Sequence, residues 1–276
     1  MNLPLILCIL PAAGVLAANS PAQPVHWSPG AGGNGHWYEA VGEPSGINWS
    51  GANAGAIGAG GHLATIASAA ENGFCFSLVD APQYWNPNSF NSNIGPWLGG
   101  FQTPGSGEPA GGWSWVTGEP WTFTAWAAGE PSNSGGTENT LHFFYHPAPT
   151  RSSNWNDITD TVSAVLGYLI EYEFTLEPIV PGAAGGPNGL FTSWGTPGNR
   201  VYFLASLQGG STPVPGCGGV AVDLGNPTLL GSANTSGSGG SSLTIMIPPS
   251  LRGRTAHFQA ADKTGCRVSN RVTEPL

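Results

Sequence analysis

Glycine and proline interrupt this chain too often for it to form long helices. Its 276 residues include 43 glycines and 25 prolines, and both residue types destabilise the interior of a helix. Only 8% of the residues are charged, whereas long solvent-exposed helices are rich in charged side chains. We therefore expect loops and short strands with few helices, arranged as one large domain or two domains of ordinary size.

The charged residues are unevenly divided along the chain. Residues 1–174 carry 12 acidic side chains and a single basic one, Arg151, which gives a net charge of −11, whereas residues 175–276 have a net charge of +2. Such a step in composition predicts two domains. The acidic balance argues against nucleic acid as a partner, because binding to phosphates requires a basic surface. Carboxylates, which are ligands for hard cations such as calcium, are concentrated in the first domain.

The first 17 residues have the features of a secretory signal peptide. Residues 3–17 are an apolar run that ends in small residues, as cleavage before Ala18 requires. A membrane-spanning helix needs roughly 18–20 apolar residues, and no second apolar run of that length follows. We therefore expect residues 1–17 to be removed, and the remaining chain to be secreted to an extracellular or periplasmic compartment without a membrane span.

The next segments predict a flexible leader and then an α+β domain. Residues 18–34 are rich in proline, glycine and asparagine and form the expected leader, and residues 35–174 form the domain. Apolar residues recur at helical spacing over residues 49–59. The sequence SAAE at residues 68–71 has the form of a capping box and predicts a second helix that ends near residue 78. Aromatic or alternating segments predict strands at residues 35–39, 97–100, 113–116, 141–145 and 167–174.

The remainder of the chain has the composition of a linker followed by an all-β domain. Residues 175–198 contain the sequence PGAAGGPNG and predict the linker. Residues 199–276 are expected to form a small β-sandwich. Its predicted strands are separated by glycine, serine and proline turns and lie at residues 200–207, 219–223, 242–247 and 256–260.

Three cysteines follow the predicted signal peptide. Cys217 and Cys266 lie in the same predicted domain, and we expect them to form a disulfide in an oxidising compartment. Cys75 lies among the apolar residues at positions 74–78. In such a setting a free thiol is expected to be an inert, buried hydrophobe.

The residues best suited to bind a ligand lie in the segment GEPSNSGGTEN at positions 129–139 and in the tripeptide WND at positions 155–157. These segments supply three carboxylates, from Glu130, Glu138 and Asp157, together with several amide and hydroxyl oxygens. Calcium takes about six to eight oxygens of these kinds. A loop of asparagine, serine, glycine and glutamate is also typical of a solvated surface turn, so the composition by itself leaves both interpretations open.

A series of short motifs occurs in a fixed order between residues 34 and 174. They are NGHWYE at 34–39, WxxAxxxA at 49–56, GGHLATI at 60–66, EN at 71–72, WLGG at 97–100, GGWSWVTGEP at 111–120, FTAWAAGEP at 123–131, WND at 155–157 and GYLIEYE at 167–173. In this order they resemble the C-type lectin-like family. One such motif would be a weak signal, but the complete series is a specific one. The resemblance implies two helices, small antiparallel sheets and a long loop region that carries the ligand site.

The resemblance also implies binding of a glycan through a calcium ion. The residues that it places around the ion are Glu130, Ser132, Glu138, Asn156 and Asp157. The same residues, with Asn133, would contact sugar hydroxyls, and the peptide bond before Pro131 would be cis. Ser132 departs from the family, because carbohydrate-binding members have asparagine or aspartate at this position. A hydroxyl is a poorer calcium ligand, and Asn133 would replace it if the loop shifted by one residue.

The two disulfides of the family are absent from this chain. Ala56 and Ile170 stand at one pair of cysteine positions, and Thr140 and Asp160 stand at the other. Each bridge is lost at both ends, which is compatible with the same fold. We expect burial of aromatic side chains to compensate, since most of the 11 tryptophans lie in this domain.

Other candidate residues favour structural roles. His142 and His146 are four residues apart in a predicted strand, where packing is favoured over a shared metal. Glu119 and Glu130 follow identical Gly-Glu-Pro turns, but a glycan-cleaving pair of carboxylates is the least favoured hypothesis. The chain contains none of the common motifs of hydrolases or phosphate-binding proteins. The segments IPPSLRG at 247–253, HFQA at 257–260 and GCRVSN at 265–270 resemble a small β module at the C-terminus of many secreted bacterial proteins, with an expected anchoring or spacer role.

The leading hypothesis is thus a secreted, calcium-dependent glycan-binding protein that is not an enzyme. Its partner would be a free glycan or a cell-surface carbohydrate. The alternative is a lectin-like domain that binds a protein partner, or serves in adhesion, without a metal.

Overall fold

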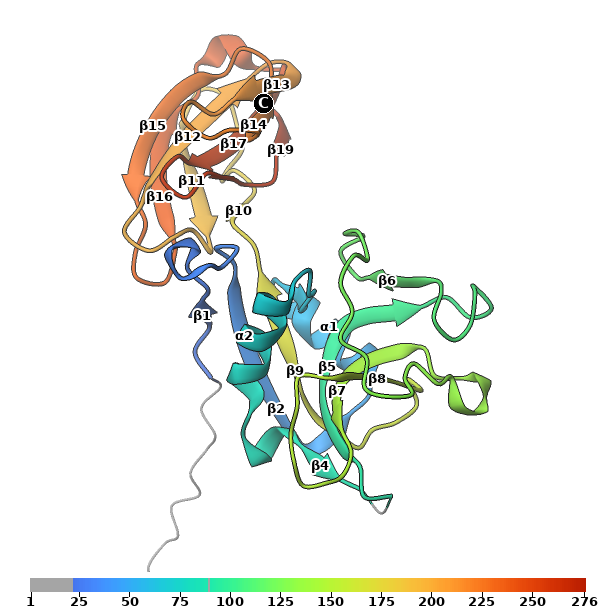
Figure 1. The fold of residues 1–276 in the computed structure, drawn as a ribbon. Helices are drawn as coiled ribbons and strands as arrows, with labels where there is room; N and C mark the ends of the chain where they lie inside the picture. The colour runs from blue at the N-terminus through green and yellow to red at the C-terminus, as the bar shows by residue number, and fades with distance from the viewer. Residues whose placement is uncertain (1–21, 89) are drawn as a thin grey trace, which may run out of the picture.

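The computed structural model describes residues 22–88 and 90–276. The predicted signal peptide at residues 1–17 lies outside these residues. Figure 1 shows an N-terminal part that contains both α-helices and a C-terminal part built of strands, joined where the chain leaves β9 (Val165–Tyr172) and enters β10 (Thr175–Leu176). In the described residues, no helix combines the length and the apolar character needed to cross a membrane.

The N-terminal part is built on a nine-stranded, almost entirely antiparallel sheet. Its central path runs β1-β2-β9-β5-β7-β8; β3 also pairs with β9, and β4 and β6 pair with β5. The strands not yet delimited are β1 (Val25–His26), β2 (Trp37–Ile47), β3 (His62–Leu63), β4 (Asn86–Pro87), β5 (Asn93–Gln102), β6 (Trp113–Trp115), β7 (Thr140–Tyr145) and β8 (Trp155–Ile158). Because β2 pairs with β9, the beginning and the end of this part of the chain lie side by side.

Two α-helices pack against this sheet, and each begins at a side-chain cap. The helix α1 (Trp49–Gly58) begins after Asn48, whose side chain accepts a hydrogen bond from the Gly51 N–H. The helix α2 (Ala69–Val79) begins after Ser68, which accepts from the Glu71 N–H. Both helices lie where the sequence predicts them. Single 3-10 turns occur at η1 (Pro29–Ala31), η2 (Pro82–Tyr84), η3 (Ser134–Gly136) and η4 (Pro249–Leu251).

Aromatic side chains fill the core of the N-terminal part. Trp155 is fully buried, and its ring meets the rings of Trp115, Trp121 and Trp126 with centroids 5.8–5.9 Å apart. The two positions of one missing disulfide, Ala56 and Ile170, belong to a single buried apolar cluster. Direct packing therefore takes the place of a bridge at these positions, as burial of apolar surface would require.

The flexible leader predicted at residues 18–34 is wrong for the described residues of that segment. β1 pairs with β2, and Trp27 is only 8% exposed. The Trp27 ring stacks on Phe74 of α2 at a centroid distance of 5.1 Å. Burial of one large aromatic ring outweighs the loop-forming composition around it, which is why composition alone misled the prediction.

The C-terminal part contains three small sheets around a second apolar cluster. One sheet has the order β10-β11-β16, a second has the order β15-β12-β17-β18 with β19 beside β17, and β13 pairs with β14. The cluster between the two larger sheets includes Leu190, Val201, Phe203 and Phe258. The strands are β11 (Pro187–Ser193), β12 (Arg200–Ser206), β13 (Gly209–Pro213), β14 (Ala221–Leu224), β15 (Thr228–Asn234), β16 (Ser241–Met246), β17 (Thr255–Asp262), β18 (Arg267–Val268) and β19 (Val272–Pro275).

The linker predicted at residues 175–198 is also wrong. This segment contributes β10 and β11 to a sheet, and β11 pairs with β16 along its whole described register from Pro187 to Thr192. Alternate residues of β11, among them Leu190 and Thr192, are buried. This alternation of buried and exposed side chains is short and lies among glycines and prolines. The composition of the segment therefore concealed a half-buried strand.

The cysteine predictions are confirmed. Cys217 and Cys266 form a disulfide across 49 residues of sequence. Cys75 is a free thiol with no exposed surface. Burial raises its pKa well above the ordinary value, so the thiol remains protonated and unreactive.

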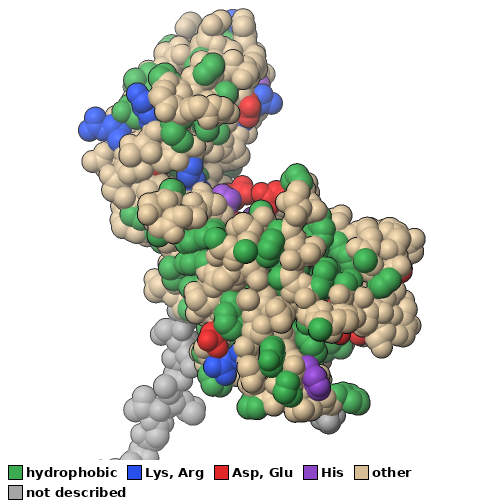
Figure 2. All heavy atoms as spheres, viewed as in Figure 1, with side chains coloured by type: hydrophobic (Ala, Val, Ile, Leu, Met, Phe, Trp, Pro, Cys, Tyr) green, Lys and Arg blue, Asp and Glu red, His purple; other side chains and the backbone are tan. Residues whose placement is uncertain are grey.

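The two parts of the chain touch directly through residues near Trp194. The Trp194 ring stacks on Tyr172 with centroids 4.0 Å apart, and Arg267 donates hydrogen bonds to the carbonyls of Gly35 and Trp194. Figure 2 shows acidic and histidine side chains in the notch where the two parts meet, while lysine and arginine lie mostly on the C-terminal part. The surface thus follows the uneven division of charge in the sequence.

Candidate functional site

The candidate site lies where the loop between β6 and β7 meets β8. Strands β7 and β8 are paired, with Leu141 opposite Asp157. This pairing brings Glu138, which lies two residues before β7, to the same end of the sheet as Asp157. The Glu130–Pro131 peptide bond in the loop is cis, as predicted.

Asp157 anchors the loop. Its side chain is fully buried, and its two oxygens accept hydrogen bonds from the backbone N–H groups of Ser132 (2.9 Å) and Asn133 (2.7 Å). Hydrogen bonds to a carboxylate are stronger than those between neutral groups. A buried aspartate on a strand therefore holds residues 132–133 at the site.

Glu138 closes the other side of the loop. One of its carboxylate oxygens accepts from the Ser134 N–H at 2.6 Å and from the Ser132 hydroxyl at 3.2 Å. The predicted residues Glu138, Ser132 and Asp157 are therefore brought together by the fold, although they are up to 25 residues apart in sequence.

Asn133 holds the loop in shape with both ends of its side-chain amide. Its carbonyl oxygen accepts from the Glu138 N–H at 3.1 Å, and its NH2 group donates to the Glu108 carboxylate at 2.9 Å. Asn133 has a φ of 44°, a left-handed conformation that asparagine tolerates better than most residues. Sequence analysis missed Glu108. Its Gly-Glu-Pro triplet also occurs at residues 42–44, 118–120 and 129–131, so the sequence contains no signal that singles out Glu108.

Two carboxylates of the site, those of Glu130 and Glu138, have raised pKa values. Burial raises the pKa of Glu130, and the neighbouring charges of Asp157 and Glu138 raise it further. Burial also raises the pKa of Glu138, with a further contribution from Asp157. Like charges gathered in a partly buried place favour either a proton or a bound cation.

Several buried oxygens at this end of the sheet have no hydrogen-bond donor. They are Glu130 Oε2, Asn139 Oδ1 and Asn156 Oδ1. The Asn156 NH2 group lies 3.2 Å from His142 Nε2, so only the carbonyl end of this amide is unpartnered. A buried acceptor without a donor destabilises a fold by about 1–3 kcal/mol. Water, a ligand hydroxyl or a cation would each satisfy these oxygens.

The oxygen atoms of the site are of the kinds that calcium binds, but they do not form a preformed calcium cage. All candidate ligands are oxygens, as calcium prefers. However, no group of three or more His, Cys, Asp or Glu side chains in the described part of the chain is disposed to hold a metal. Both Asp157 oxygens are engaged by loop N–H groups. Asp157 would have to release the loop before its side chain could coordinate an ion.

The remaining residues singled out from the sequence lie in other surroundings. His142 is fully buried, its ring meets Trp97 at 5.8 Å, and burial lowers its pKa to about 4. His146 instead donates a hydrogen bond from Nδ1 to the Asn91 carbonyl oxygen at 3.1 Å. Glu119 accepts from Thr65 at 2.8 Å, in a hydrogen-bonded cluster separate from that of Glu130.

This second cluster, which sequence analysis missed, joins α2, β2 and β9. The Tyr38 hydroxyl lies 2.6 Å from the Glu71 carboxylate and 2.9 Å from that of Glu171, and His36 Nδ1 lies 2.6 Å from Glu171. Glu171 also accepts from the Thr65 N–H at 2.9 Å, and the Thr65 hydroxyl, with its one proton, lies within 2.9 Å of both Glu171 and Glu119. Its polar groups satisfy one another, so its contribution is to hold the elements together.

Comparison with known proteins gives only a weak likeness. No protein-family model matches the chain, and no curated protein matches it. The cow C-type carbohydrate-recognition domain of CD23, solved with GlcNAc2Man3 oligosaccharide, is 18% identical and covers 55% of this chain and 94% of that one, with a TM-score of 0.38. A Ca2+-dependent type II antifreeze protein in its Ca2+-free form is 22% identical over 50% and 93% of the two chains, with a TM-score of 0.38. The mouse scavenger receptor C-type lectin carbohydrate-recognition domain is 20% identical over 50% and 90%, with a TM-score of 0.37. Likeness at this level assigns no family to the chain and carries no conclusion about its ligand.

Proposed function

We propose that this chain is a secreted, lectin-like protein that binds glycans through the loop at residues 129–139 and the adjoining strand β8, with calcium as its cofactor. The observation that carries the proposal is the group of buried, donor-free oxygens beside three mutually repelling carboxylates. Sugar hydroxyls donate hydrogen bonds to such oxygens, and a divalent cation neutralises such carboxylates. The order of sequence motifs supports the same proposal.

Each residue of the site has a proposed task. The ion would be bound by side-chain oxygens of Glu130, Glu138 and Asn156. The Ser132 hydroxyl would be a poorer ligand beside them. Bound calcium would supply positive charge and open coordination positions for vicinal hydroxyls. Asp157 and Asn133 hold the loop, since their hydrogen bonds fix residues 132–138. The proposed role is binding, and no residue is assigned a catalytic task.

Calorimetric titration of the full chain with calcium tests the metal, and a glycan array with and without chelator tests the ligand. Glu130→Gln should abolish or strongly weaken calcium binding, because it removes a charge and keeps the shape. Glu173→Gln is the matched control, since the Glu173 side chain is 51% exposed and lies outside the site. Absence of both calcium and glycan binding by the unaltered protein would reject the proposal.

A second candidate function is recognition of a protein partner without metal. The observation that favours it is the engagement of both Asp157 oxygens by the loop amides, which closes the loop without an ion. Protein binding that survives the chelator would favour this candidate. Secretion is part of both proposals, and N-terminal sequencing of the exported protein, with residue 18 expected first, tests it.

A further inference from the structure

We propose that the C-terminal part carries a second binding site, independent of the loop site at residues 129–139, for a short aliphatic carboxylate bound by Lys263. The site is a cavity of about 360 Å³ between the five-stranded sheet and the hairpin of β13 and β14. Its lining comes from β12, β13, β14, β15 and β17 and from the segments that follow β13, β14 and β17. The volume lies in the range of about 300–1,000 Å³ that is usual for small-molecule pockets.

The cavity exists because β12 presents side chains to both faces of its sheet. Phe203 belongs to the apolar cluster between the two larger sheets, so its neighbours Tyr202 and Leu204 point to the opposite face. There the hairpin covers part of the sheet, and Val222 of β14 belongs to a separate buried cluster. Leu229, on the edge strand β15, remains 56% exposed. The hairpin thus covers this face incompletely and leaves a cavity with an apolar rim.

Lys263 is the one charged residue that lines the cavity, and it is the only lysine of the chain. It follows β17 directly, and its side-chain Cε lies 3.7 Å from the Cβ position of Gly216 in the hairpin loop. The side chain therefore extends from the sheet toward the hairpin at one end of the cavity. Among the described residues, Lys263 forms no ion pair. An unpaired ammonium at the end of an apolar cavity is complementary to a carboxylate on an apolar ligand.

The strand register places the apolar end of the cavity away from the ammonium. Tyr202 pairs with Ala261, and Lys263 lies two residues beyond Ala261. Leu204 lies two residues from Tyr202 in the opposite direction along the sheet and pairs with Leu229. At about 3.3 Å per residue, Lys263 and Leu204 are separated by roughly 13 Å along the strands. A ligand with its carboxylate at Lys263 would thus extend a short aliphatic chain to the two leucines, past the Tyr202 hydroxyl, which is a further donor.

The walls favour an aliphatic ligand over the carboxyl terminus of a peptide. Three of the lining residues, Pro213, Pro215 and Pro227, have no backbone N–H. The carbonyl groups of a bound peptide would therefore find few donors in the walls, and a buried acceptor without a donor weakens binding. An aliphatic chain has no such groups to satisfy.

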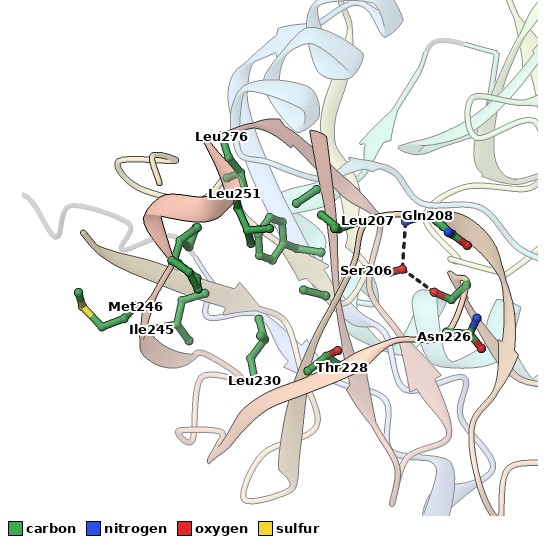
Figure 3. Close-up of a pocket in the computed structure, with 16 residues that line it drawn as sticks. Ser206, Leu207, Gln208, Asn226, Thr228, Leu230, Ile245, Met246, Leu251 and Leu276 are labelled. Atoms are coloured by element: carbon green, nitrogen blue, oxygen red, sulfur yellow. Dashed lines mark hydrogen bonds between the residues drawn. The ribbon is translucent and has the colours of Figure 1, made fainter. Parts of the chain in front are cut away.

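A larger cavity in the same part of the chain provides a comparison. Figure 3 shows this cavity, of about 560 Å³, between the two larger sheets. None of the side chains that line it is charged, so a carboxylate would lie there without a cation. We therefore expect the ligand to prefer the cavity at Lys263. Met246 is 68% exposed at the rim of the larger cavity, and substitution there distinguishes the two cavities.

Calorimetric titration of the full chain with octanoate and with octanol tests the cavity, and a chelator keeps the loop site free of calcium. We expect saturable binding of octanoate and about fivefold weaker binding of octanol, because exposed ion pairs contribute modestly. Leu229→Asp should weaken the binding of both probes at least about fivefold, since it places a charge at the apolar end. Met246→Asp is the matched control and should change neither affinity. Absence of saturable octanoate binding, or a loss in Met246→Asp but not in Leu229→Asp, would overturn the site.

A dipeptide carboxylate, N-acetyl-leucyl-leucine, distinguishes a peptide terminus from an aliphatic ligand. We expect it to bind more weakly than octanoate, because the prolines of the walls offer no N–H groups to its carbonyls. Equal or tighter binding of the dipeptide would overturn the choice of an aliphatic ligand.

Lys263→Gln tests the contact with the carboxylate. We expect about fivefold weaker binding of octanoate and unchanged binding of octanol. Arg254→Gln removes an exposed charge outside the cavity and should change neither affinity. Because Lys263 is the only lysine, its acetylation by acetic anhydride, followed by peptide mapping, gives a second measurement, and bound octanoate should slow it. Unchanged octanoate affinity in Lys263→Gln, or an unchanged rate of acetylation, would overturn the assignment of a carboxylate ligand.

Discussion

Ser132 and Asn133 are neighbours in the loop but differ in what they can offer a ligand. Both ends of the Asn133 amide are engaged, by the Glu138 N–H and by Glu108. The Ser132 hydroxyl makes a single longer contact of 3.2 Å with Glu138 and belongs to an exposed residue. Asn133 is therefore a poor substitute for the missing calcium ligand, and position 132 is the one where a better ligand can be introduced.

We predict that Ser132→Asn tightens calcium binding by about tenfold, the equivalent of ~1.4 kcal/mol. The longer amide carries a carbonyl oxygen, which is a better calcium ligand than a hydroxyl. Calorimetry with calcium measures the change, and Ser134→Asn provides the same substitution two residues away as a control. If Ser132→Asn binds no more tightly than Ser134→Asn, position 132 does not face the ion.

Glu108 is predicted to act on the site through Asn133. Glu108→Ala removes the acceptor of the Asn133 NH2 group and should lower the free energy of unfolding by about 1–2 kcal/mol. It should also weaken ligand binding, because the loop loses a fixed point. Glu108→Gln keeps an oxygen acceptor and should recover most of both losses. Denaturant unfolding and calorimetry measure these effects, and a failure of Glu108→Gln to recover either would contradict the positioning role.

At the scale of elements, a buried polar cluster joins α2, β2 and β9. Glu71 comes from α2, Tyr38 from β2 and Glu171 from β9, and the Tyr38 hydroxyl lies within 2.9 Å of both carboxylates. Burial lowers the pKa of His36, but its hydrogen bond with Glu171 outweighs burial and raises that pKa above 6.5. Burial raises the pKa of Glu171, but His36 lowers it below 4.5. The two groups therefore stabilise each other in their charged forms.

This pair predicts a stability maximum in mild acid. The contribution of Glu171 is present above pH 4.5 and is lost as the pH falls through its lowered pKa. The contribution of His36 is present below pH 6.5 and is lost as the pH rises through its raised pKa. The free energy of unfolding, measured by denaturant, should therefore be highest between pH 4.5 and 6.5. His36→Gln should flatten the profile, whereas His257→Gln should leave it unchanged; an unaltered profile in His36→Gln would count against the pair.

Sequence predicted the elements that carry strong local signals. The SAAE capping box marked the start of α2 at Ala69, and aromatic segments marked β5, β6, β7 and β9. It did not predict Trp27 or β11 as parts of a core, because their burial depends on partners distant in sequence, such as Phe74 for Trp27. At the site, it grouped Ser132, Glu138 and Asp157, which hydrogen bonds join, with Glu130, whose pKa the neighbouring charges raise. It missed Glu108, whose only link to the loop is a side-chain contact 25 residues away.

At the scale of the whole molecule, the two parts are joined by more than the connecting chain. Trp194 stacks on Tyr172 and meets Trp37 edge-on at a centroid distance of 5.9 Å. Trp37 also donates a hydrogen bond from its ring to the Gly195 carbonyl at 3.3 Å. Arg267 reaches from the C-terminal part to the Gly35 carbonyl. Trp37 and Tyr172 are paired on the neighbouring strands β2 and β9, so separation of the two parts would expose aromatic surface on each.

We predict that the unaltered protein unfolds in one calorimetric transition and that the double variant Trp194→Ala, Arg267→Ala unfolds in two. Removal of the indole deletes the stacking with Tyr172, and removal of the guanidinium deletes the hydrogen bonds to Gly35 and Trp194. The loss of a large, partly buried ring corresponds to about 2–3 kcal/mol, enough to uncouple two units that each retain their own apolar cluster. Phe191→Ala is the control, because Phe191 lies on β11 near this junction but is 46% exposed. A single transition in the double variant, shifted to lower temperature, would mean that other contacts couple the two parts and that the Trp194 junction does not control their cooperativity.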